Sequence, residues 1–94
     1  MEIQIGNFNR LIKSFNVSSR KQDEDIVRTQ LTIDCIDIDD DVEYISNSIT
    51  EEMEENNVKI LNGDLVYNFP DYELNSVDKY VSESSSRLSI TFVK

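Results

Sequence analysis

The stretch "IVRTQLTIDCIDI", residues 26–38, is the clearest strand in the sequence. It is rich in β-branched residues, which favour strands. Its side chains alternate between an apolar and a polar set: Val27, Leu31, Ile33 and Cys35 against Arg28, Gln30, Thr32 and Asp34. A period of two predicts a strand with one buried face. Towards its end Ile36 and Ile38 fall on the polar side, which indicates a bulge or a strand end covered on both faces.

A helix is predicted directly after this strand, over residues 39–54. Asp39 or Asp40 is a natural N-cap, and Glu43 follows at the spacing of a capping box. The pair Asn56-Asn57 indicates the end of the helix. Apolar residues recur at spacings of three and four and form one narrow stripe, which consists of Val42, Ile45, Ile49 and Met53.

Three further strands are predicted. Asn-Gly between "VKIL" (58–61) and "LVYNF" (65–69) is a strong hairpin signal, and "RLSITFV" (87–93) alternates cleanly. Residues 8–17 fit both a helical spacing and one face of a strand. A strand is favoured there, because "SSRKQDED" (18–25) is typical of an exposed hairpin loop and a clear strand follows it.

The expected fold is α+β, in a single domain over residues 1–94. A small antiparallel sheet of about five strands would carry one main helix, about 39–54, packed on one face. Leu74, Val77 and Val81 recur at a helical spacing, which leaves room for a second short helix near residues 73–82.

The chain has a formal net charge of −10, and the charge is unevenly distributed. Residues 22–57 contain thirteen acidic residues and one basic residue, whereas residues 1–21 carry a net +3 and residues 58–94 a net −1. Direct binding of nucleic acid or of anionic membranes through a basic patch is therefore not expected. No secretory leader or long apolar segment is found, and the predicted location is the cytoplasm, of the host if the protein is viral.

No catalytic signature is found, and the protein is predicted not to be an enzyme. There is no His, and the lone Cys35 on the apolar face of a strand is typical of a small buried hydrophobe. An EF-hand starting at Asp37 would have Val42 in place of the turn glycine and Ser48 in place of the bidentate glutamate. Neither a cofactor nor a metal site is predicted.

The acidic residues of the predicted helix have two explanations. At its start, carboxylates meet free N–H groups and the positive end of the helix dipole, so Asp40 and Glu43 need no function there. At its end the dipole favours cations, yet the sequence places Glu51, Glu52, Glu54 and Glu55 in this position. These glutamates either solubilise the surface or bind a partner, and together with Asp40 and Glu43 they form the predicted partner-binding set.

In size, in charge and in its acidic helix, the chain looks like the small acidic inhibitors of phages and mobile elements. That resemblance implies a binding protein that mimics the charge of nucleic acid and blocks a basic, nucleic-acid-binding protein of the host. The alternative is a structural subunit of a virion or tail, which would form homo-oligomers through strand edges, with residues 87–93 as the candidate edge.

Overall fold

The fold is described from a computed structural model, which places residues 1–23, 26–36, 41–82 and 86–94. Within these ranges the chain forms seven strands and one helix. Their order is β1 (Glu2–Ile5), β2 (Phe8–Asp23), β3 (Ile26–Cys35), α1 (Val42–Glu52), β4 (Val58–Asn62), β5 (Leu65–Phe69), β6 (Glu73–Val81) and β7 (Ser86–Val93).

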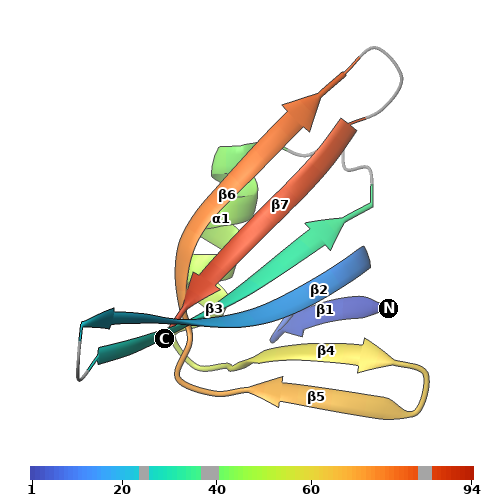
Figure 1. The fold of residues 1–94 in the computed structure, drawn as a ribbon. Coiled ribbons are helices and arrows are strands. Elements are labelled where there is room, and N and C mark those ends of the chain that lie inside the picture. The colour runs from blue at the N-terminus through green and yellow to red at the C-terminus, as the bar shows by residue number, and fades with distance from the viewer. Residues whose placement is uncertain (24–25, 37–40, 83–85) are drawn as a thin grey trace.

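All seven strands belong to one antiparallel sheet, in the order β5-β4-β1-β2-β3-β7-β6. The long strand β2 joins its two halves, since its first residues pair with β1 and its later residues pair with β3. Figure 1 shows the sheet twisting strongly from the β4–β5 hairpin to the β6–β7 pair, with α1 packed against the β6 side. The expected sheet of about five strands with two helices is therefore wrong.

The sequence patterns do not predict strands β1 and β6, for two different reasons. β1 has only four residues, which is too short for a pattern to be decisive. β6 imitates a helix in the sequence because Leu74 and Val77 are three residues apart. A bulge at Asn75 explains this spacing: Leu74 pairs with Phe92 and Val77 pairs with Ile90, so both residues lie on the core face.

A second bulge explains why residues 8–17 also fitted a helical spacing. Ile12 pairs with Cys35 and Phe15 pairs with Ile33, with a register shift between them at Lys13. Both side chains therefore face the core, although they are three residues apart. The strand prediction for this segment is confirmed.

The predicted loop over residues 18–25 is much shorter than expected. β2 continues to Asp23 and β3 begins at Ile26, and the pairing runs as far as Asp23 with Ile26. A paired backbone satisfies its own hydrogen bonds whatever the side chains are, so a polar sequence is compatible with this part of the hairpin. At the other end β3 stops at Cys35 and Ile36 is exposed, whereas Ile38 lies outside the described residues.

The core fills the space between the helix and one face of the sheet. Ile45 and Ile49 of α1 are fully buried, and so are Ile33 of β3 and Phe92 of β7. Val42 and Met53 complete the predicted stripe, but they are only partly buried. Among the described residues, the remaining buried apolar side chains come from five strands and are Ile3, Ile5, Phe8, Ile12, Leu31, Cys35, Val58, Ile60, Leu88 and Ile90.

An aromatic cluster extends this core to the outer strand β5. Phe15 of β2 lies 5.6 Å from Tyr67 and 6.0 Å from Phe69 between ring centroids. Phe69 in turn makes an edge contact with Tyr72 at 5.9 Å. The sheet therefore curls far enough for β5 and β2, which are not neighbours in the strand order, to share side-chain contacts.

Candidate functional site

The N-cap of helix α1 lies one residue after Asp40 and two after Asp39, the two predicted caps. Asp41 is the N-cap, and its carboxylate accepts a hydrogen bond of 3.1 Å from the backbone N–H of Glu43. Glu43 is exposed in the first turn, where its charge is favourable to the helix dipole. Asp39 and Asp40, the two predicted caps, lie outside the described residues, so the place of Asp40 in the partner-binding set stays a prediction.

Glu52 has a structural partner far away in the sequence. Its Oε2 accepts a hydrogen bond of 3.2 Å from the backbone N–H of Asn7, in the turn between β1 and β2. The side-chain amide of Asn56 donates to the same oxygen at 3.4 Å. A Cβ atom at Gly6 would collide with this carboxylate, so the turn fits closely around Glu52. Its position at the helix end therefore has a local explanation in the fold.

The other three glutamates at this end have no such explanation. The side chains of Glu51, Glu54 and Glu55 are exposed, and within the described ranges they make no hydrogen bond or ion pair. The last turn of α1 contains no basic residue. Backbone hydrogen bonds from Glu54 to Glu51 and from Glu55 to Glu52 hold them close to the helix end. Three unpaired carboxylates thus stand beside the negative end of the helix dipole.

Glu43 is separated from this group. Glu51 follows Glu43 by eight positions, which corresponds to about 12 Å along a helix axis. The predicted set is therefore divided by the structure into Glu43 at the helix start, Glu52 in a structural contact, and the trio Glu51, Glu54 and Glu55, which we call the acidic end.

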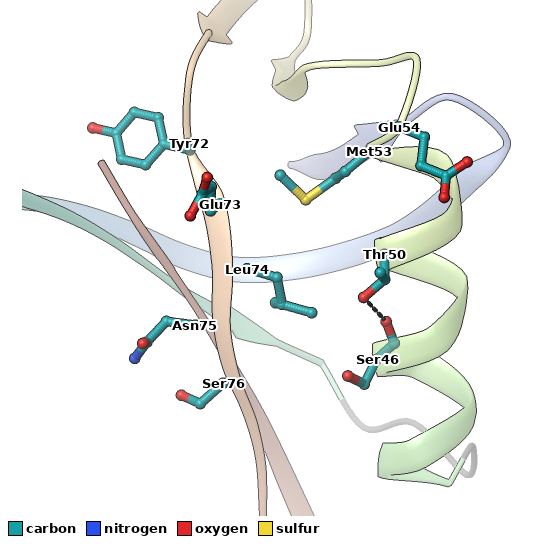
Figure 2. A pocket seen from close by; sticks show the side chains of 9 residues that line it. All are labelled: Ser46, Thr50, Met53, Glu54, Tyr72, Glu73, Leu74, Asn75 and Ser76. Atoms are coloured by element: carbon teal, nitrogen blue, oxygen red, sulfur yellow. Dashed lines mark hydrogen bonds between the residues drawn. The ribbon is translucent and has the colours of Figure 1, made fainter.

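A pocket adjoins the acidic end, between the second half of α1 and the first half of β6. Its volume is about 440 Å³. Figure 2 shows Met53 extending from the helix end and Leu74 extending from β6 into the space between the two elements, so that they form part of its apolar lining. The Thr50 hydroxyl is occupied, since it donates a hydrogen bond of 2.8 Å to the carbonyl of Ser46. The full lining consists of Ser46, Thr50, Met53, Glu54, Tyr72, Glu73, Leu74, Asn75 and Ser76.

Two of the lining residues are exposed carboxylates, Glu54 from the helix end and Glu73 from β6. Met53, Leu74 and Tyr72 are partly buried and belong to the edge of the core. The pocket therefore combines an apolar floor with acidic groups. Glu54 is the member of the acidic end that lines it, whereas Glu51 and Glu55 line neighbouring hollows.

Sequence reasoning missed the β6 side of this pocket. Residues 73–76 fall in the segment near 73–82 whose spacing suggests a short helix, and no sequence pattern places them opposite the end of α1. One signal was present: Met53 closes the apolar stripe of the helix among glutamates, where an apolar side chain needs a neighbour to cover it.

Cys35 and the acidic side chains are the other groups whose chemistry can be examined in the described residues. Cys35 is buried, and burial together with the nearby negative charge of Asp34 raises the pKa of its thiol to about 11. A thiol with this pKa is a poor nucleophile at neutral pH. In the described part of the chain, no three Cys, Asp or Glu side chains are grouped so that they could hold a metal ion.

Two further results concern membrane-spanning helices and similarity to known proteins. In the ranges that the structure covers, no helix has the length and apolar character needed to span a membrane. Comparisons with protein-family models, with curated proteins and with solved structures find no match to this chain.

Proposed function

We propose that this protein is a non-enzymatic binding module whose acidic end docks onto a basic segment of another protein. The observation that carries the proposal is the trio Glu51, Glu54 and Glu55, exposed and unpaired beside a pocket with an apolar floor. Carboxylates at the carboxyl end of a helix lower its stability by a few tenths of a kcal/mol each. A cation from a partner would remove that cost.

The pocket suits the side chains of Lys and Arg. Their aliphatic stems cover apolar surface while the charged head stays near water and carboxylates. The stem would lie on Met53 and Leu74, and the cation would be within the field of Glu54, Glu73 and the helix end. A basic partner thus supplies the positive charge that the last turn of α1 lacks.

The partner class follows from the charge of the whole chain. With a net charge of −10, association with a basic surface would be accelerated by electrostatic steering and weakened by salt. Basic surfaces that attract such a protein are common on nucleic-acid-binding proteins, so the module would compete there with nucleic acid. The mode of action is that of a phage or mobile-element inhibitor, working in the cytoplasm of the host.

The test compares two variants of equal net charge. One reverses the acidic end (E51K/E54K/E55K), and the other reverses three acids elsewhere (E2K/D64K/D78K). Each substitution raises the net charge by two, so both variants go from −10 to −4. Affinity purification from the native host should lose its specific partners with the first variant and keep them with the second. Equal capture by both would show that only overall charge matters and would refute the proposal.

The second candidate, an assembly subunit that uses residues 87–93 as its edge, needs a correction. β7 pairs with β3 on one side and with β6 on the other, so it is not an edge strand. The two edges of the sheet are β5 and β6. Sedimentation separates the candidates, because an assembly subunit forms a ring or polymer and an inhibitor of the proposed type need not.

A further inference from the structure

Strand β5 is an open sheet edge with exposed apolar side chains on both of its faces. Leu65 is 57% exposed, Val66 61% and Tyr67 40%. The strand contains no charged residue and no proline, and its pairing with β4 has no bulge from Val58 with Phe69 to Asn62 with Leu65. Edges that must remain single are usually protected by charges, prolines or bulges. β5 has none of these features.

The opposite edge, β6, shows what such protection looks like. It contains Glu73, Asp78 and Lys79, and its register is broken by the bulge at Asn75. Its first half also faces α1. The same chain therefore protects one edge and leaves the other ready to pair.

The free backbone groups of β5 follow from its turn. Gly63 has a φ of +60° and opens a two-residue turn closed by Asn62 and Leu65. Because hydrogen-bonded and non-hydrogen-bonded pairs alternate in an antiparallel ladder, the N–H and C=O groups of Leu65, Tyr67 and Phe69 point towards β4. Those of Val66 and Asn68 point outwards, and no described strand pairs with them.

A second copy of β5 complements this edge. With a two-fold axis at Tyr67, Val66 of each copy pairs with Asn68 of the other, so that four outward hydrogen bonds can form. The same axis places Leu65 beside the other copy's Phe69, apolar against apolar. This geometry is self-consistent, as an interface between identical subunits requires.

Charge also favours this edge for self-pairing. Two copies with a net charge of −10 repel each other, so they can only approach through a region that adds little charge. Residues 58–70 contain Lys59 and Asp64 and no other charged residue. α1 packs mainly against β6, at the opposite edge of the sheet. Glu55 of the acidic end lines a hollow with Gln4 of β1 and Lys59 of β4, and no residue of β5 lines that hollow.

We infer that β5 pairs antiparallel with β5 of a second copy of this chain and forms a closed two-fold dimer. The protected β6 edge prevents the addition of further copies, so no fibre grows. A pairing of five residues lies at the small end of specific interfaces. The dimer should therefore form in a concentration-dependent way. This inference rests on β5 alone and is independent of the proposed function.

The test is the mass of the protein in solution, measured by sedimentation equilibrium over a range of concentrations. The wild type should rise from 10.9 kDa to twice that mass. Val66→Lys places a charge on the pairing edge, and Asn68→Pro removes an outward N–H without touching the bonds to β4. Both should remain at the monomer mass while keeping a native circular dichroism spectrum. Val81→Lys is the matched control, since Val81 is 76% exposed at the end of β6, and it should dimerise like the wild type.

Three results would overturn the inference. A wild type that stays monomeric up to about 1 mM, the weak limit of specific association, would leave β5 without a second copy. A polymer would contradict the closed dimer. A dimer that survives in both the Val66→Lys and Asn68→Pro variants would place the interface elsewhere.

Discussion

Neutralising the acidic end should stabilise the protein, although the exchange removes no clash and fills no cavity. Glu51, Glu54 and Glu55 lie beside the carboxyl end of α1, where a negative charge is unfavourable. At about 0.3 kcal/mol for each exposed carboxylate, the triple variant E51Q/E54Q/E55Q should gain about 1 kcal/mol. For a domain of this size that gain raises the melting temperature by about 4–8 °C.

The assay is thermal unfolding at neutral pH, followed by circular dichroism at two salt concentrations. In about 0.01 M salt the Debye length is about 30 Å and the gain should be fully visible, whereas in about 1 M salt it is about 3 Å and the gain should nearly vanish. Glu52 is left unchanged, because its carboxylate holds the turn at Asn7.

Glu43→Gln is the control at the other end of the same helix. It changes the net charge in the same direction, but it removes a carboxylate that the helix dipole favours. Glu43→Gln should therefore raise the melting temperature by less than one third of the rise seen in the triple variant. The claim that the helix dipole penalises these carboxylates is refuted if the triple variant does not gain stability at low salt, or if Glu43→Gln gains as much per substitution.

Three further predictions concern the fold. Gly6→Ala should lower the free energy of unfolding, measured with urea, more than Gly63→Ala does. Both glycines have a positive φ, but only at Gly6 would the new Cβ meet the Glu52 carboxylate. Equal losses of stability would contradict this prediction. The pKa of the Cys35 thiol rises from 9.0 to about 11 on folding, so the folded state holds the thiol proton more tightly. The contribution of this thiol to the free energy of unfolding should therefore be complete below pH 9 and be lost between pH 9 and 11. Cys35→Ala should lack this loss, and identical pH profiles of the two proteins would contradict the prediction. Phe92→Ala should cost about 3–5 kcal/mol in the same urea assay, since Phe92 is fully buried, and a loss below about 1 kcal/mol would show that the core is not packed as described.

Much of the fold could be predicted wherever one periodicity ran undisturbed. The strand at Ile26–Cys35, the helix stripe around Ile45 and Ile49, and the Asn-Gly hairpin all follow from local patterns. These segments have regular pairing or regular helical spacing, so the identity of each residue reports directly on the face it occupies.

Bulges account for the main error. A bulge sets two residues of one strand against one of the next, so residues three apart come to share a face. Leu74 and Val77 on β6 and Ile12 and Phe15 on β2 therefore imitate helical spacing. At residues 8–17 the clear strand that follows favours a strand over a helix. At residues 73–82 no neighbouring sequence feature favours the strand.

The candidate site could be predicted only in part, because its parts come from distant segments. The misplaced glutamates at the helix end are visible in the sequence, since the dipole rule applies locally. The role of Glu52 was not visible, because its partner Asn7 is 45 residues away. The pocket depends on β6 lying beside α1, and that contact required the correct topology.

We expect the acidic end and the pocket beside it to recognise cationic side chains. The most direct measurement is a titration of the isotope-labelled protein with a short Lys/Arg-rich peptide, followed residue by residue by nuclear magnetic resonance. The largest shifts should occur at residues 50–55 and 72–76, and the Met53 methyl group should be among them. Shifts that spread evenly over all acidic segments, or that centre on the aspartates before α1, would contradict it.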